Sequence, residues 1–117
     1  NDVFKMAIAV APVTNWRFYD SVYTERYMTT PQENASGYDD NSPINHVDKL
    51  KGKFLLIHGS GDDNVHVQNS MQMMEALIQA NKQFDSQIYP DNNHGIYGGK
   101  TRVQLCTKMT NFIKENL

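Results

Sequence analysis

Residue patterns that identify several common protein classes are scarce or absent in this chain of 117 residues. It has a single cysteine, Cys106, which excludes an internal disulfide framework and a zinc site built on paired cysteines. Its histidines form no H-E-x-x-H arrangement, and the Asp62-Asp63-Asn64 run lacks the glycine and the distal glutamate of a calcium loop. We therefore expect no metal site and no cofactor.

Long apolar runs and a dominant charge are also missing. The longest apolar run, residues 6–13, is far shorter than the roughly 20 residues that cross a bilayer. The formal net charge of −2 provides no field that would gather nucleic acid, so we expect no nucleic-acid partner. The chain begins with Asn1 and not with Met, which we interpret as the start of a fragment or a processed product.

The pattern of apolar residues predicts alternating strands and helices. Strands are predicted at residues 4–13, 53–58 and 84–89, and helical segments at 15–28, 65–80 and 101–117, with a loop and a short helix in 29–48. Such alternation indicates right-handed βαβ units on a parallel sheet. The predicted fold class is therefore α/β, with about three parallel strands flanked by helices. So narrow a sheet, with an open edge near residue 4, favours a portion of a larger sheet.

Two loops that follow predicted strands hold an acid and a histidine. GSGDDNVH follows the strand KFLLIH, and PDNNHG follows FDSQIY. Functional side chains of a parallel sheet gather at the carboxyl ends of its strands. In α/β-hydrolases the triad runs Ser, Asp or Glu, then His along the chain, so Asp62 and His94 are candidates for the acid and the base. Asp62 capping the next helix is the competing interpretation.

Other polar residues of these loops have plainer explanations. Capping or turn formation is expected of Asp63, and His58 is expected to be a packed, hydrogen-bonded histidine at a strand end. His46 and His66 are expected at the surface or in structural roles. None of the serines fits the nucleophile motif G-x-S-x-G; around Ser60 the flanking positions hold histidine and aspartate. We therefore expect the nucleophile to lie upstream of Asn1.

An aromatic-rich segment precedes the loop region. Trp16, Tyr19, Tyr23 and Tyr27 recur every three or four residues, so they could share one helical face. A stripe of aromatic side chains on one helical face more often packs into the hydrophobic core than lines a substrate pocket. A box of aromatic faces would nevertheless bury a small rigid ring such as proline well.

The motifs AVAPVTNWRFYDSVYTERYM, LLIHGSGDDNVHVQNS and DNNHGI resemble the C-terminal catalytic segment of the dipeptidyl peptidase IV branch of the prolyl oligopeptidase clan. The resemblance implies that residues 1–117 are the last part of an α/β-hydrolase domain, without its nucleophile segment and its β-propeller. It also implies release of X-Pro, and less readily X-Ala, dipeptides from free peptide N-termini. A bacterial member, a periplasmic or cell-surface location and a homodimeric parent are further expectations.

Site roles follow from the same resemblance. It implies that Asp62 is the triad acid, that His94 is the base, and that Asn64 hydrogen-bonds a substrate carbonyl. The implied walls of the proline pocket are Tyr19, Tyr23, Trp16, Val13 and Val65, with Tyr19 also facing the substrate amine.

Alternatives stay open at this point. A prolyl endopeptidase or acylaminoacyl peptidase of the same clan would act on blocked N-termini. A non-catalytic hydrolase-like binding module would be expected to lack a triad residue. On any of these interpretations the chain alone is expected to be inactive.

Overall fold

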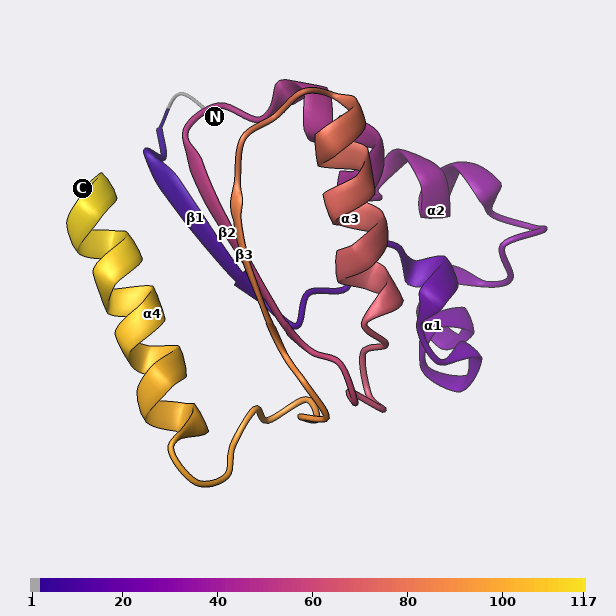
Figure 1. Ribbon diagram of the computed structural model, residues 1–117. Helices are drawn as coiled ribbons and strands as arrows, with labels where there is room; N and C mark the ends of the chain where they lie inside the picture. Colours follow the sequence, from indigo (N-terminus) through magenta and orange to yellow (C-terminus); the bar gives the residue numbers. More distant parts are fainter. Residues whose placement is uncertain (1–2) are drawn as a thin grey trace.

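The computed structural model describes residues 3–117 as a three-stranded parallel sheet between two layers of helices (Figure 1). Strands β1 (Met6–Val10), β2 (Lys53–Gly59) and β3 (Asp85–Tyr89) lie in the order β1-β2-β3. The central strand β2 has helices over both faces, so its residues from Leu55 to Gly59 are all buried. This double burial explains the continuous apolar run. The predicted α/β class with three parallel strands is confirmed.

Helices cover the two faces of the sheet unequally. Helix α4 (Thr101–Asn116) lies alone over one face, and α3 (Gln68–Gln79) lies over the other (Figure 1). The α3 side also carries α1 (Ser21–Met28), α2 (Ala35–Asp40) and the short 3₁₀ helices η1 (Trp16–Phe18) and η2 (Pro43–Lys49). No helix within residues 3–117 is long and apolar enough to cross a bilayer.

The main core lies between the sheet and α4. Alternate residues of the paired strands point to this side, in the register Ile8↔Leu55 and Ile57↔Gln87. The buried cluster consists of Leu55, Ile57, Tyr89, Ile96, Leu105 and Phe112. Ile96 belongs to the loop between β3 and α4, so this core also anchors a loop that carries candidate site residues.

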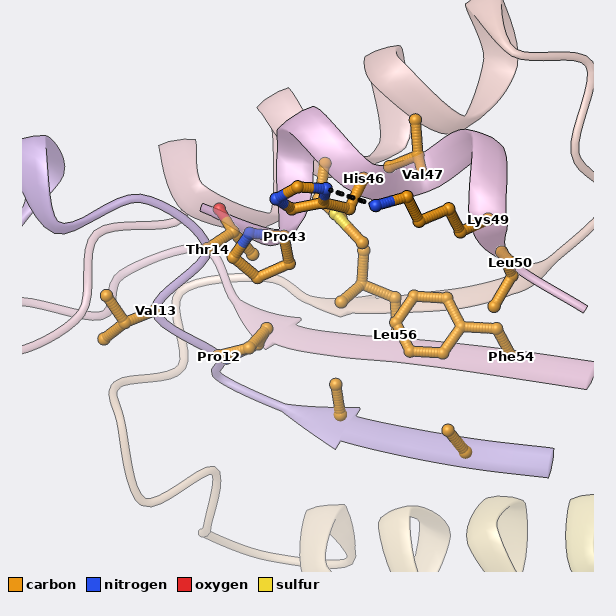
Figure 2. A pocket seen from close by; sticks show the side chains of 13 residues that line it. Pro12, Val13, Thr14, Pro43, His46, Val47, Lys49, Leu50, Phe54 and Leu56 are labelled. Carbon is orange, nitrogen blue, oxygen red and sulfur yellow. Dashed lines mark hydrogen bonds between the residues drawn. The ribbon is translucent and has the colours of Figure 1, made fainter. Parts of the chain in front are cut away.

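The α3 side of the sheet is less completely filled. A cavity of about 400 Å³ lies over Ala7 and Ala9 of β1 and Phe54 and Leu56 of β2 (Figure 2). Residues of η2 form its other wall. The small side chains of β1 at this face leave the space open.

The aromatic segment differs from the single helix expected over residues 15–28. The chain forms the 3₁₀ turn η1, becomes extended at Tyr19, and starts α1 at Ser21. Asp20 caps α1 by accepting a hydrogen bond from the amide of Val22 at 2.8 Å. A good capping residue inside the periodic pattern therefore divides it.

Helix α3 begins at Gln68, three residues later than predicted. The preceding residues 65–67 belong to a turn held by polar contacts. Several apolar residues of the two helices are exposed: Met71 and Ile78 of α3, and Val103 and Ile113 of α4. Each helix meets only one thin sheet, so a narrower stripe of each is buried than the pattern suggested.

Candidate active site

Two loops meet where β2 and β3 end. The amide of Gly61 donates to the carbonyl of Asn92 at 2.9 Å, and the amide of Asp91 donates to Ser60 Oγ at 2.8 Å. Gly59 permits this approach, because a Cβ there would overlap the Asn92 carbonyl oxygen and lie 2.8 Å from that of Asn93. Parallel neighbouring strands thus bring residues about 30 positions apart to one edge.

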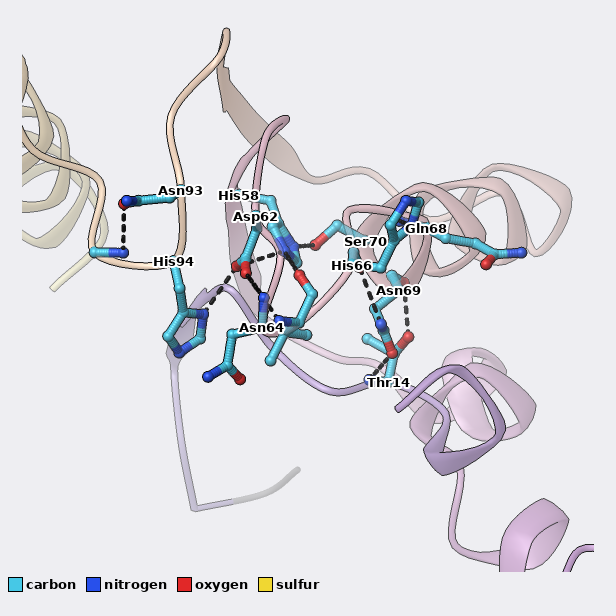
Figure 3. A network of polar contacts seen from close by, with 12 residues as sticks. Thr14, His58, Asp62, Asn64, His66, Gln68, Asn69, Ser70, Asn93 and His94 are labelled. Atoms are coloured by element: carbon cyan, nitrogen blue, oxygen red, sulfur yellow. Dashed lines mark hydrogen bonds and ion pairs between the residues drawn. The ribbon is translucent and has the colours of Figure 1, made fainter. Parts of the chain in front are cut away.

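Asp62 and His94 lie together at this edge (Figure 3). His94 Nδ1 donates to Asp62 Oδ2 at 2.8 Å. The Asp62 side chain is fully buried, whereas the His94 side chain is 46% exposed. Among the described residues no partner is found for His94 Nε2, so this nitrogen is available to a group outside them. A buried carboxylate behind a half-exposed imidazole is the arrangement in which a histidine acts as a general base.

The two oxygens of the Asp62 carboxylate have different partners, and Asp62 does not cap α3, whose N-cap is Val67. Its Oδ1 accepts from the amides of Asn64 at 2.9 Å and Val65 at 2.8 Å, which holds the turn before α3. Its Oδ2 faces His94. Burial acts to raise the pKa of Asp62, but the hydrogen bonds from His94 and from the amides of Val65 and Asn64 outweigh it. The pKa of Asp62 therefore lies below its ordinary value, and the group is ionised at neutral pH.

The His94 loop is anchored two residues later by Ile96. This side chain is 1% exposed and belongs to the α4-side core, yet its φ is +46°. A β-branched residue in the left-handed region is an outlier that costs about 1–3 kcal/mol. Burial of the side chain offsets this cost and fixes the backbone just after His94.

The other histidines are placed as structural residues. His58 is completely buried and hydrogen-bonded, as expected. His46 and His66 are exposed, and His66 Nδ1 accepts from the amide of Gln68 at the start of α3. Asp63 is exposed. Within residues 3–117 no three histidine, cysteine or acidic side chains are grouped so that they could hold a metal ion.

The aromatic side chains form a cluster despite the broken helix. Ring centroids lie 5.6 Å apart for Trp16 and Tyr19, 5.4 Å for Tyr19 and Tyr23, and 6.3 Å for Trp16 and Tyr23. The Tyr19 hydroxyl donates to Asn64 Oδ1 at 2.9 Å. This bond joins the cluster to the loop of Asp62, so residues about 45 positions apart in the chain meet at one site.

The remaining predicted pocket residues lie elsewhere or are covered. Val13 lines the cavity of Figure 2. Val65 is 4% exposed and offers little surface. A smaller hollow of about 180 Å³ is lined by Trp16, Tyr23 and Tyr27, with Thr24 and Met28. A single pocket containing all the predicted walls is therefore not formed by the described residues alone, and the roles of Val13 and Val65 stay predictions.

Sequence reasoning missed that a second histidine approaches the acid. His58 Nε2 lies 3.2 Å from Asp62 Oδ2. The available signal was strand alternation, which points His58 to the same face as Leu56, toward the helix that carries Ser70.

Comparison with known proteins identifies the family to which the chain is related. The family model described as the prolyl oligopeptidase family matches residues 1–117. A probable dipeptidyl-aminopeptidase B of Coccidioides posadasii is 54% identical over 113 residues, which cover 94% of this chain and 12% of that protein. Dipeptidyl peptidase 4 of Felis catus is 47% identical over 116 residues, covering 97% and 15%.

Structural comparison gives the same relationship. The crystal structure of Porphyromonas gingivalis dipeptidyl peptidase 4 matches with a TM-score of 0.95 and 58% identity, covering 97% of this chain and 16% of that one. The chain thus spans less than a fifth of the length of each of these relatives. Since the family model covers the whole sequence, the chain belongs to the prolyl oligopeptidase family.

Proposed function

We propose that this chain supplies the acid and the base of a serine-type dipeptidyl peptidase, with the nucleophilic serine outside these 117 residues. The observation that carries the proposal is the 2.8 Å bond between buried Asp62 and half-exposed His94. The relatives named above are dipeptidyl peptidases, which supports the same reaction class. The domain from which the chain comes is then an α/β-hydrolase domain, with residues 1–117 at its C-terminal end.

The proposed reaction passes two protons through His94, one during acylation and one during deacylation. Neutral His94 takes the serine proton on Nε2 as the hydroxyl attacks the peptide carbonyl. Asp62 keeps the other ring proton on Nδ1 and stabilises the imidazolium that forms. His94 then gives the proton to the leaving amine, and water repeats the sequence on the acyl-enzyme.

The proposed substrates are peptides with a free N-terminus and proline, less readily alanine, at the second position. The faces of Trp16, Tyr19 and Tyr23 offer apolar surface for a proline ring. The Tyr19 hydroxyl donates a hydrogen bond to Asn64 Oδ1, and this bond orients the Asn64 side-chain amide. Its Nδ2–H group is then free to donate to a substrate carbonyl. In the complete pocket, Val13 and Val65 would add apolar walls.

A hybrid enzyme tests this function. The matching segment of the P. gingivalis dipeptidyl peptidase 4 is replaced by this chain, and the host with its own segment is the control. Hydrolysis of Gly-Pro-p-nitroanilide is compared with that of Gly-Gly-p-nitroanilide and of N-acetyl-Gly-Pro-p-nitroanilide. We expect cleavage of the first substrate only.

Three outcomes would contradict the proposal. A folded hybrid without activity would favour the non-catalytic binding module. Cleavage of the acetylated substrate at a similar rate would favour an endopeptidase or acylaminoacyl peptidase. Equal rates with Gly-Pro-p-nitroanilide and Gly-Gly-p-nitroanilide would contradict the proposed proline pocket.

A further inference from the structure

We propose that His58 is a positioning residue for the catalytic acid, locked in one tautomer by Ser70, with its Nε2 in contact with the same Asp62 oxygen that binds His94. This inference rests on the proposed function. Its basis is the set of polar contacts behind the site (Figure 3), in which two imidazoles converge on a single carboxylate oxygen.

The contacts of His58 define its protonation pattern. Its Nε2 lies 2.7 Å from the carbonyl oxygen of Val65 and 3.2 Å from Asp62 Oδ2. Both oxygens can only accept, so Nε2 carries a proton. Its Nδ1 lies 2.6 Å from Ser70 Oγ, whose hydroxyl can donate to an unprotonated nitrogen. With its proton on Nε2, the ring donates to the Val65 carbonyl, accepts from Ser70, and keeps the polarised N–H group beside Asp62 Oδ2.

Ser70, His58 and Asp62 are the three residue types of a catalytic triad, yet they do not form a second active site. His58 and Ser70 are both 0% exposed, so no peptide can reach the hydroxyl. The nitrogen nearer the acid is also Nε2, and the nitrogen that faces serine is Nδ1, the reverse of the triad arrangement. The remaining role for Ser70 and His58 is to hold neighbouring groups in position.

The held group is the carboxylate of Asp62. Asn64 and Val65 amides fix Oδ1, and His94 binds Oδ2 from the exposed side. His58 Nε2, on a side chain that is 0% exposed, lies 3.2 Å from Oδ2. Without this contact the carboxylate has room to rotate, and rotation would lengthen the bond to His94. A displacement of about 1 Å at a reacting group can cost about 100-fold in rate.

His58 is itself fixed by a rigid frame. Ser70 lies in α3, and the adjacent Asn69 is also 0% exposed. Asn69 Oδ1 accepts from the amide of Thr14 at 3.1 Å, and its carbonyl accepts from Thr14 Oγ1 at 2.6 Å. Thr14 directly precedes the segment of Trp16 and Tyr19. One buried polar network therefore fixes two positions relative to α3: that of Asp62, and that of the chain just before the aromatic cluster.

Two substitutions at position 58 separate hydrogen bonding from filling of space. In the hybrid enzyme, His58→Leu fills the site without a donor, whereas His58→Gln places an amide N–H near the position of Nε2. We expect His58→Leu to lower kcat per active site by at least about tenfold, because the acid is displaced, while KM changes less than about twofold. His58→Gln is expected to recover most of that rate.

Ser70→Ala provides an independent variant should His58→Leu fail to fold. Loss of the hydroxyl frees the His58 tautomer, so kcat per site is expected to fall by about three- to tenfold. Ser86→Ala, at an exposed serine of β3, is the matched control and should leave kcat unchanged. Active sites are counted by titration with a fluorophosphonate. A merely structural role would lower the number of sites and leave kcat per site unchanged, and that result would overturn the proposal.

A crystallographic measurement separates this inference from the proposed function. In the structure of the His58→Leu or Ser70→Ala hybrid, we expect the distance from Asp62 Oδ2 to His94 Nδ1 to exceed 3.5 Å, beyond hydrogen-bond range. An unchanged distance of 2.8 Å would contradict the positioning role even in an inactive hybrid. An inactive unsubstituted hybrid contradicts only the proposed function.

Discussion

The chemistry of this molecule is concentrated on the carboxylate of Asp62. Three N–H groups donate to it, two backbone amides on Oδ1 and His94 on Oδ2, and His58 Nε2 lies 3.2 Å from Oδ2. A fully buried carboxylate is costly unless it is satisfied in this way. The same contacts that stabilise the charge aim it at His94, so stability and the proposed catalytic geometry depend on the same atoms.

Replacement of Asp62 by asparagine tests the role of this charge. In the hybrid enzyme we expect Asp62→Asn to lower kcat per titrated site by about 10³- to 10⁴-fold, because the amide no longer stabilises the imidazolium and favours the wrong tautomer of His94. Asp63→Asn, at the exposed neighbour, is the control and should stay within about twofold. Comparable losses in both variants would mean that the loop, and not the Asp62 charge, matters.

The lowered pKa of Asp62 also predicts a dependence of stability on pH. Because the folded pKa lies below the unfolded value of about 3.9, ionised Asp62 stabilises the fold fully above that value. The contribution is lost as the pH falls through the folded pKa. In urea unfolding of this chain, the difference in free energy between the original sequence and Asp62→Asn should shrink from pH 6 to pH 2.5. A difference that stays constant or grows would contradict the assignment.

At the scale of the elements, the close approach of two strand ends builds the site. β2 and β3 end side by side, and the loops that follow exchange backbone hydrogen bonds between Gly61 and Asn92 and between Ser60 and Tyr89. Ile96 then ties the second loop to the core under α4. The position of His94 is thus set by backbone contacts on one side and by a buried side chain on the other.

Gly59→Ala tests the close approach. The added methyl group would overlap the Asn92 carbonyl, so the His94 loop must shift, and we expect kcat of the hybrid to fall at least about tenfold. Gly99→Ala makes the same chemical change where no atom lies within 4 Å. That control carries only the cost of its positive φ, about 1–2 kcal/mol, and should keep kcat within about threefold. Equal kcat for the two variants would show that the contact is unimportant.

Much of the order of strands and helices could be predicted, because continuous runs of apolar residues indicate buried strands. The run in β2 is continuous since both faces are covered, and the placement of Asp62 and His94 after neighbouring strands follows from parallel pairing. The break at Tyr19 and Asp20 could not be read from periodicity, because a capping side chain overrode it. The contact of His58 with Asp62 depends on the late start of α3, which the apolar pattern does not encode.

At the scale of the whole molecule, the chain holds part of a site. The described residues provide a carboxylate, an imidazole and an aromatic cluster, while β1 lies at the outer edge of the sheet. The relatives are more than five times longer, so many of their residues have no counterpart in these 117. The proposed pocket and nucleophile would be completed by such residues.

We therefore predict that the 117-residue chain alone does not hydrolyse Gly-Pro-p-nitroanilide and is not labelled by a fluorophosphonate. Its serines include none in a nucleophile elbow, and Ser70, the one bonded to a histidine, is inaccessible. The assay uses protein freed of host peptidases, with the hybrid as positive control. Labelling of the chain at any serine would show that it holds its own nucleophile.

The most direct test of the central claim is kcat per folded molecule of the hybrid carrying His94→Gln, beside His46→Gln at an exposed histidine remote in the chain, with folded protein counted by circular dichroism. If Asp62 and His94 form the acid–base pair, His94→Gln should lower kcat by at least about 10³-fold while His46→Gln leaves it unchanged. A His94→Gln enzyme that retains most of its activity would contradict the assignment of His94 as the base.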